Sequence, residues 1–151
     1  MKIFVTVGTT TFDSLIEFLD NHLDTNDEIL FQIANGKYLP SNFKYIRFTN
    51  DIDTMYREYD YIITHAGAGT IYQLLDLQKR FIVVPNLDRV DGHQTDIAQF
   101  LVDGSYALSC TEFKEIIPSL EKLPSVAFNT YEKESFFRGT DICKFIKSNV
   151  L

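Results

Sequence analysis

Short apolar runs alternate along this chain with stretches in which apolar residues recur every three or four positions. The runs are rich in β-branched and aromatic residues and predict six strands, at residues 2–7, 28–34, 43–48, 61–64, 81–84 and 106–109. The periodic stretches predict helices at residues 12–23, 52–59, 70–77, 93–102 and 112–123. Because apolar strands alternate with helices, we expect an α/β fold with a doubly wound parallel sheet of about six strands.

Three features concern the ends of helices. Asp13 stands in the first turn of the first helix, where a carboxylate suits the helix dipole, so a capping role is favoured over contact with a ligand. Gly104 is expected to end the helix of residues 93–102. A last segment, from about residue 131, predicts a C-terminal helix that packs either on this domain's own sheet or on a partner. Its apolar positions are Ile142, Phe145, Ile146 and Val150.

The composition fits a single globular domain spanning residues 1–151. The net charge of −7 argues against binding to nucleic acid and against direct adsorption to an anionic membrane surface. Only two cysteines, Cys110 and Cys143, are present, which predicts reduced thiols in a cytosolic protein. The first strand pattern begins at Lys2, so no signal peptide is expected. No set of His, Cys, Asp and Glu has metal-ligand spacing, and no metal is expected.

Residues 61–73, Tyr-Ile-Ile-Thr-His-Ala-Gly-Ala-Gly-Thr-Ile-Tyr-Gln, join a predicted strand to a predicted helix through a glycine-punctuated turn. Glycines let a ligand approach the backbone, and the first N–H groups of a helix have no partner inside it, so the turn suits a phosphate or diphosphate. A plain turn with small residues for packing is the alternative. Polar turns after residues 2–7 and 81–84 reach the same sheet edge, where such sheets bind ligands, and this convergence favours the ligand site.

Three ordered motifs resemble those of a known family. They are residues 4–16, Phe-Val-Thr-Val-Gly-Thr-Thr-Thr-Phe-Asp-Ser-Leu-Ile; residues 65–70, His-Ala-Gly-Ala-Gly-Thr; and Val83-Val-Pro-Asn86 with Asp91-Gly-His-Gln94. They resemble the small donor-binding subunit of two-component UDP-sugar glycosyltransferases. That family includes bacterial PssE-type subunits of exopolysaccharide and capsule synthesis and the eukaryotic catalytic subunit that adds the second GlcNAc to dolichol-linked GlcNAc. It is similar to the C-terminal half of MurG-like GT-B enzymes, the glycosyltransferase family 28 C-terminal domain, which implies a Rossmann-like fold.

The resemblance implies a role for each matching residue. Approach to the donor's diphosphate or sugar is implied for Gly8, Thr9 and Thr10. A diphosphate cradle is implied for Gly67, Ala68, Gly69 and Thr70, and recognition of the sugar hydroxyls for His93 and Gln94. His65 would either hold the glycine turn through hydrogen bonding or contact the donor, and both roles remain open. Gln73 stands where many relatives have a Glu that binds the ribose; an amide can still donate and accept hydrogen bonds, but it lacks the charge that strengthens them.

The implied activity is inverting transfer of a hexose to a polyprenyl-diphosphate-linked sugar, without a cofactor. GlcNAc, Glc and Gal all fit, and UDP-GlcNAc is the first choice by resemblance. No catalytic residue is assigned, because the general base would lie on a membrane-anchored, PssD-type acceptor-binding subunit that forms a heterodimer with this chain. The chain would be cytoplasmic, recruited by that partner to the cytoplasmic face of the membrane, and would have little activity alone.

The sequence suggests two alternatives to this function. The chain could be a non-catalytic enhancer or scaffold subunit with weak donor binding, and Gln73 is the residue that motivates this alternative. A dinucleotide-binding domain is disfavoured, because the turn at residues 8–11, Gly-Thr-Thr-Thr, lacks the Gly-x-Gly-x-x-Gly pattern.

Overall fold

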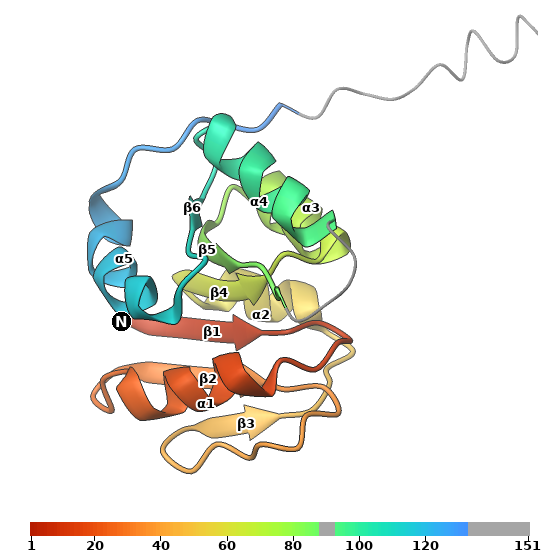
Figure 1. Cartoon of the computed structure of the whole chain (residues 1–151), viewed down its shortest axis with the longest axis vertical. Helices are drawn as coiled ribbons and strands as arrows, with labels where there is room; N and C mark the ends of the chain where they lie inside the picture. Colours follow the sequence, from red (N-terminus) through yellow and green to blue (C-terminus); the bar gives the residue numbers. More distant parts are fainter. Residues whose placement is uncertain (88–92, 133–151) are drawn as a thin grey trace, which may run out of the picture.

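The computed structural model describes residues 1–87 and 93–132 (Figure 1). Its strands form one parallel sheet in the order β3-β2-β1-β4-β5-β6. They are β1 (Lys2–Thr6), β2 (Glu28–Gln32), β3 (Lys44–Ile46), β4 (Tyr61–His65), β5 (Arg80–Val84) and β6 (Leu108–Ser109). The helices are α1 (Asp13–His22), α2 (Ile52–Glu58), α3 (Ala68–Asp76), α4 (His93–Asp103) and α5 (Ile116–Lys122), with 3-10 turns η1 (Phe113–Glu115) and η2 (Leu123–Ser125). The predicted doubly wound parallel sheet is confirmed.

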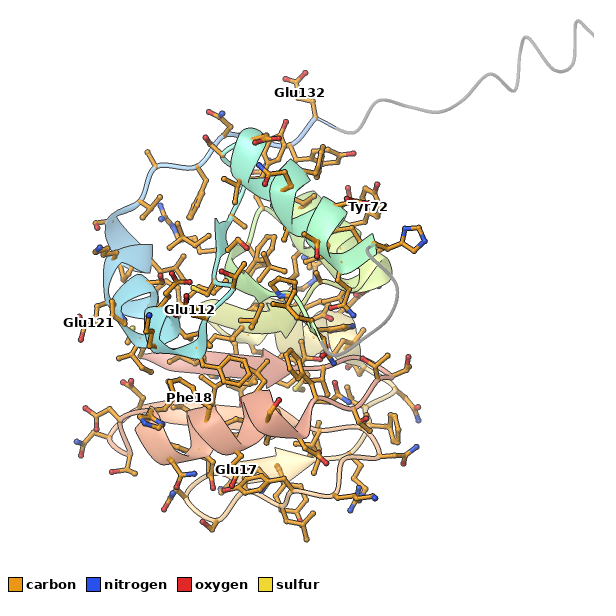
Figure 2. All side chains as sticks on the ribbon, viewed as in Figure 1. Glu17, Phe18, Tyr72, Glu112, Glu121 and Glu132 are labelled. Carbon is orange, nitrogen blue, oxygen red and sulfur yellow. The ribbon has the colours of Figure 1, made fainter. Side chains whose placement is uncertain are left out.

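The sheet has a hydrophobic core on each face. Central strand β1 shows why, since its successive side chains point to opposite faces. Ile3 and Val5 join the core under α1 and α5, whereas Phe4 joins the core under α2, α3 and α4. Charged side chains on the outer surfaces of α1 and α5, including Glu17 and Glu121, point away from the sheet (Figure 2). Every central strand is therefore buried on both sides, as its continuous apolar run predicted.

Helix α4 ends where the sequence predicted, but the left-handed residue is Ser105, with a φ of 53°. Its N–H donates to the Val102 carbonyl over 3.0 Å, and the Tyr106 N–H donates to the Leu101 carbonyl over 2.9 Å. This double hydrogen bond closes the helix, as in a Schellman motif. Gly104 has a different role, because a side chain there would collide with the ring of Tyr106. The same closing geometry recurs after α3, at Gln78.

Asp13 lies in the first turn of α1, as predicted, but makes no cap. The residue preceding the helix is Phe12, and no side chain caps it. The Asp13 carboxylate instead accepts the backbone N–H of Lys37, at 3.0 Å and 3.1 Å from its two oxygens. It therefore ties the start of α1 to the loop that follows β2.

Asp20 is a buried carboxylate whose role the sequence did not indicate. It is 1% exposed on α1 and accepts hydrogen bonds from the Tyr38 hydroxyl at 2.8 Å, the Ser41 N–H at 2.9 Å and the Asn42 N–H at 3.0 Å. These groups precede β3, so Asp20 holds the chain that leads into this edge strand. The hydrogen bond to Asp20 is also the main reason why the pKa of Tyr38 is raised.

Cys110, directly after β6, is buried, and its burial raises the pKa of the thiol. The predicted C-terminal helix and Cys143 lie outside the described residues. No helix within residues 1–87 and 93–132 is both long and apolar enough to cross a membrane.

Candidate functional site

The order of the sheet reverses direction between β1 and β4. From β1 the chain adds β2 and β3 on one side, then returns to place β4 on the other side of β1, with Thr6 paired to Thr64. The loops that follow β1 and β4 therefore leave the same edge in opposite directions and open a crevice. In doubly wound sheets ligands bind in this crevice. The glycine turns of both predicted donor motifs meet here.

A pocket of about 210 Å³ lies at this edge. Among the residues predicted to bind the donor, Gly8, Thr9, Thr70 and Gln73 line it. Sequence reasoning missed the rest of the lining, which comes from strand ends, the loop after β3 and helix α2: Thr6, Gln32, Phe48, Thr49, Ile52 and Tyr56. The available signal was an aromatic residue at the end of the third predicted strand, Phe48, which is 51% exposed at the rim of the pocket.

The imidazole of His65 fills the space between the two glycine turns. It is 5% exposed, and a Cβ built on Gly8 would lie 2.9 Å from its Cε1. A side chain at Gly67 would also collide with this ring. Gly8 has a φ of 61°, which favours glycine in its own right. Both glycines are thus explained by the protein's own packing, and the position of His65 suits holding the turns.

Gly69 is different, because nothing in residues 1–87 and 93–132 requires a glycine there. A Cβ at this position meets no atom of another described element within 4 Å, and Gly69 and the preceding Ala68 are both exposed. They open α3, whose N-cap residue Gly67 provides no side-chain cap. The first amides of α3 therefore face an open space with the positive end of the helix dipole behind them, which is an arrangement that attracts an anion.

Thr70 connects this helix start to the pocket wall. Tyr56 on α2 is 1% exposed, and its burial raises the pKa of the phenol, while a hydrogen bond with Thr70 acts in the opposite direction. A Cβ on Gly8 would also lie 3.8 Å from the Thr70 hydroxyl oxygen. The Thr70 side chain thus lies close both to α2 and to the turn that follows β1. Thr10, by contrast, does not line the pocket: its hydroxyl donates to the Val7 carbonyl at 3.1 Å, inside its own turn.

The predicted sugar-binding pair lies on the other side of the glycine turn, at the start of α4. His93 is exposed, whereas Gln94 is 8% exposed and its Oε1 accepts the backbone N–H of Asn86 at 2.8 Å. Gln94 therefore joins α4 to the loop that follows β5. Neither residue lines the pocket beside Gly8. The structure brings together the β1 and α3 residues of the predicted site and places His93 and Gln94 apart from them.

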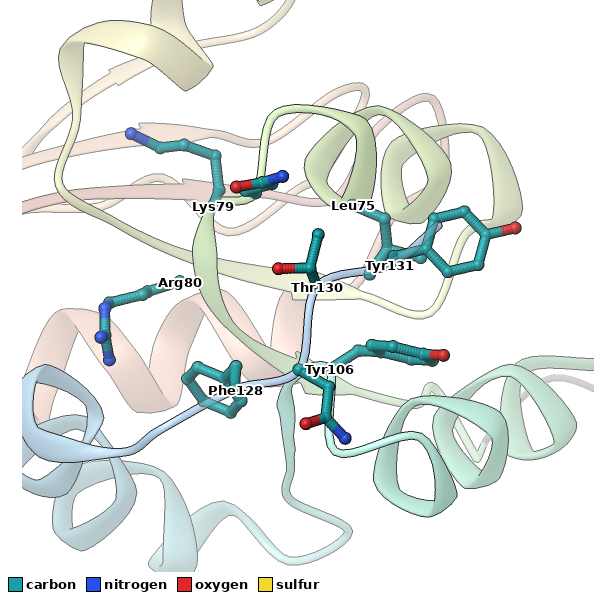
Figure 3. A pocket seen from close by; sticks show the side chains of 9 residues that line it. Leu75, Lys79, Arg80, Tyr106, Phe128, Thr130 and Tyr131 are labelled. Carbon is teal, nitrogen blue, oxygen red and sulfur yellow. The ribbon is translucent and has the colours of Figure 1, made fainter. Parts of the chain in front are cut away.

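A smaller hollow of about 100 Å³ includes two cationic side chains, Lys79 and Arg80 (Figure 3). It lies at the amino end of β5, where the Arg80 guanidinium donates to the carbonyls of Leu123 at 2.9 Å and Val126 at 2.6 Å. Arg80 therefore anchors the chain after η2. The guanidinium is therefore already hydrogen-bonded, and the hollow lies at the sheet edge opposite the glycine turns. For both reasons the hollow is a poor candidate for a donor site.

Metal ligands do not cluster in the part of the chain that the structure describes: no group of three or more His, Cys, Asp or Glu residues there could hold a metal ion.

Comparison with known proteins decides the family. The model of the glycosyltransferase family 28 C-terminal domain matches residues 2–134. The chain belongs to this family. Its domain is the Rossmann-like C-terminal half of the GT-B fold, as the three motifs predicted. The crystal structure of MurG from Acinetobacter baumannii superposes with a TM-score of 0.59 at 25% identity, covering 83% of this chain and 41% of MurG.

Two curated relatives are similar to parts of the chain. UDP-N-acetylglucosamine transferase subunit ALG13 of Homo sapiens is 32% identical over 124 residues, which cover 72% of this chain and 11% of that protein. UDP-N-acetylglucosamine–N-acetylmuramyl-(pentapeptide) pyrophosphoryl-undecaprenol N-acetylglucosamine transferase of Desulfotalea psychrophila is 35% identical over 88 residues, which cover 58% of this chain and 24% of that protein. The chain therefore spans a minor part of the length of both relatives, and what it shares with them is a glycosyltransferase domain.

Proposed function

We propose that this chain is the UDP-sugar-binding, catalytic subunit of an inverting two-component glycosyltransferase. The names of the two relatives support this proposal. One is a subunit of a UDP-N-acetylglucosamine transferase, and the other transfers N-acetylglucosamine to an acceptor carried on pyrophosphoryl-undecaprenol. The transferred hexose is GlcNAc, Glc or Gal, with GlcNAc the first choice, and the acceptor is a polyprenyl-diphosphate-linked sugar of polysaccharide or glycolipid synthesis.

The observation that carries the proposal is the open start of α3 at Gly69. A nucleotide diphosphate placed there meets the free amides of the first helical turn and the positive end of the helix dipole. Both interactions strengthen as negative charge develops on the departing diphosphate, so the helix assists departure of the leaving group without a metal ion. Thr70, in the same turn, adds a hydroxyl group beside the diphosphate.

The pocket beside Gly8 suits the nucleoside. Phe48 and Ile52 offer apolar contacts for the base, and Gln73 lies one turn into α3, within the same pocket, where it would bind the ribose hydroxyls. The sugar would extend toward α4, where His93 and Gln94 would read its hydroxyls. Since the Oε1 of Gln94 already accepts the Asn86 N–H, contact between Gln94 and a sugar would use the amide nitrogen.

The acceptor side is assigned to another polypeptide. Inverting transfer needs a general base beside the acceptor hydroxyl, and we assign that base to a membrane-anchored acceptor-binding subunit. The proposal places the chain in the cytoplasm, recruited by this partner to the cytoplasmic face of the membrane, with residues 131–151 as the segment that meets it.

Titration of ¹⁵N-labelled protein with UDP, UDP-GlcNAc, UDP-Glc and UDP-Gal tests the donor site. We expect saturable amide shifts at Gly8, Gly69 and Gln73 with all four ligands, and additional shifts at His93 with the preferred UDP-sugar. Uridine is the control, because without a diphosphate it should leave Gly69 nearly unshifted. No binding of any of the four ligands at millimolar concentration would overturn the catalytic role.

A non-catalytic scaffold subunit is the second candidate, and Gln73 in place of an acidic residue favours it. Gln73→Glu separates the two, because a carboxylate makes stronger hydrogen bonds to ribose hydroxyls than an amide does. A donor-binding subunit should bind UDP in its wild-type form and several-fold more tightly with this substitution. A scaffold subunit with weak donor binding should show no saturable UDP binding at millimolar concentration in its wild-type form.

A further inference from the structure

A buried amide lies beneath the pocket and connects its two walls. Gln32, the last residue of β2, is 3% exposed. Its Oε1 accepts the Thr6 hydroxyl at 2.6 Å, and its Nε2 donates to the carbonyls of Gly8 at 2.9 Å and Arg47 at 2.7 Å. An amide nitrogen has two N–H groups, so each has one acceptor here. These three partners fix the orientation of the amide, since exchanging its oxygen and nitrogen would place the amide oxygen against two carbonyl oxygens.

The partners of Gln32 belong to opposite walls of the pocket. Gly8 is in the turn after β1, while Arg47 directly precedes Phe48 and Thr49, which line the pocket from the loop after β3. Thr6 completes the connection, because its hydroxyl accepts the Gly8 N–H at 3.2 Å while it donates to Gln32. Both backbone polar groups of Gly8 are thus held by the side chains of two strand ends.

Arg47 extends this network to the loop after β2. Its carbonyl accepts the Ala34 N–H at 2.9 Å as well as the Gln32 amide, and its guanidinium donates to the carbonyls of Ala34 at 3.2 Å and Gly36 at 3.1 Å. Ala34 itself has a φ of 50°. Three loops at the carboxyl edge of the sheet are therefore joined through one network, and Gln32 is its buried member on the pocket side.

We infer that Gln32 is a positioning residue for donor binding, an inference that rests on the proposed function. All three polar contacts of its amide are to the protein, so it acts through the loops that it holds and not by binding the nucleotide. It fixes the Gly8 turn relative to the Phe48–Thr49 loop, so the width of the pocket is set before a ligand arrives. A pocket formed in advance lowers the entropy that must be lost on binding. Without the amide, each loop must be ordered by the ligand itself.

The test compares Gln32→Met with wild-type protein, because methionine has a similar length and makes none of the three hydrogen bonds. Gln99→Met on the exposed face of α4 is the matched control. UDP affinity is measured by calorimetry at a temperature at which all variants are folded by circular dichroism. ¹⁵N relaxation of the Thr9 and Thr49 amides is measured without ligand. We expect about tenfold weaker UDP binding and new microsecond-to-millisecond exchange at both amides in Gln32→Met only.

Two further variants keep the test decisive if Gln32→Met does not fold. Gln32→Glu keeps the acceptor for Thr6 and loses both donated bonds, so it should also loosen both loops. Thr6→Val removes the hydroxyl and should weaken UDP binding. Thr6→Ser keeps the hydroxyl and should bind UDP as tightly as the wild-type protein does. A purely structural role would lower the unfolding free energy while the folded protein bound UDP with unchanged affinity, and that result would overturn the inference.

The proposed function and the inference fail in different ways. If wild-type protein binds UDP and the folded Gln32 variants bind it equally well, the inference is wrong and the proposed function stands. If wild-type protein does not bind UDP, the proposed function fails and donor positioning fails with it. In that case the relaxation data still decide whether Gln32 holds the two loops.

Discussion

The imidazole of His65 occupies the space that the missing side chain of Gly8 leaves open. His65 is the last residue of β4 and Gly8 follows the neighbouring strand β1, and a Cβ on Gly8 would lie 2.9 Å from the His65 Cε1. A contact this short requires one of the groups to move, and the ring also lies close against Gly67. The two turns of the donor site therefore pack against each other through His65, so a substitution in one turn affects the conformation of the other.

Gly8→Ala should destabilise the protein by about 2 kcal/mol or more. The left-handed backbone at this position costs about 1–2 kcal/mol for alanine, and the collision with His65 adds to it. Urea unfolding followed by circular dichroism measures the loss. In a His65→Ala background the cost of Gly8→Ala should fall, because the collision is removed and only the backbone cost remains. Equal costs in both backgrounds would contradict the packing of His65 against Gly8.

Gly69→Ala should have opposite effects on stability and on binding. Replacing a helical glycine with alanine stabilises a helix by up to about 1 kcal/mol, and within the described part of the chain no neighbouring element obstructs the new methyl group. The new methyl group would, however, stand where the diphosphate approaches, so UDP affinity should fall at least about tenfold, or roughly 1.4 kcal/mol. Thermal unfolding and calorimetric titration of the same preparation give both values. Unchanged UDP affinity would exclude a diphosphate above this amide.

Asp20→Ala should cost about 3 kcal/mol of unfolding free energy without changing UDP affinity. The substitution removes a buried carboxylate that accepts the N–H groups of Ser41 and Asn42, and a hydrogen bond to a charged group contributes about 1.5–3 kcal/mol. These residues precede β3, so they lie at the sheet edge away from the glycine turns. Asp24→Ala, at an exposed position, is the control and should cost less than about 1 kcal/mol. A similar loss in both variants would show that burial of Asp20 is not the cause.

The free energy of unfolding should fall above pH 10, and Tyr56 should account for part of the fall. Burial raises the pKa of Tyr56 above the ordinary tyrosine value of about 10, so the unfolded chain releases this proton at a lower pH than the folded protein does. The stabilisation is complete below pH 10 and is lost as pH rises through the folded pKa. Denaturant unfolding between pH 8 and pH 12 should give a shallower slope for Tyr56→Phe. Tyr38 and Tyr59, whose pKa values are also raised, keep part of the slope.

The order of strands and helices was predictable because most strands are apolar along their whole length. Residues 62–64 of β4 are fully buried between the two helical layers, and a continuous apolar run is typical of a strand that is covered by helices on both faces. Strand β3 was harder to delimit and proved shorter than predicted. It lies at the edge of the sheet with Lys44 and Tyr45 exposed, so burial leaves little pattern in its sequence.

The glycine turns of the site were found from sequence, but the side chains that support them were not. Gln32 reads as an ordinary polar residue at a strand end, since its hydrogen-bond partners lie 15 to 26 positions away. Gln94 was predicted to read a sugar, yet its amide oxygen contacts the Asn86 N–H, which depends on how α4 meets the loop after β5. Side-chain roles that depend on the meeting of distant loops leave no local sequence signal.

The central place of β1 has a consequence for how the protein folds. Thr6 pairs with Gln32 on one side and with Thr64 on the other, so two strands distant in sequence must dock before the glycine turns can meet. Such long-range parallel pairings form slowly. The crevice between β1 and β4 therefore does not exist until the chain has folded through the end of β4 at His65. A nucleotide that binds only this finished crevice would act mainly by slowing the unfolding rate, as an interaction that is absent from an early transition state does.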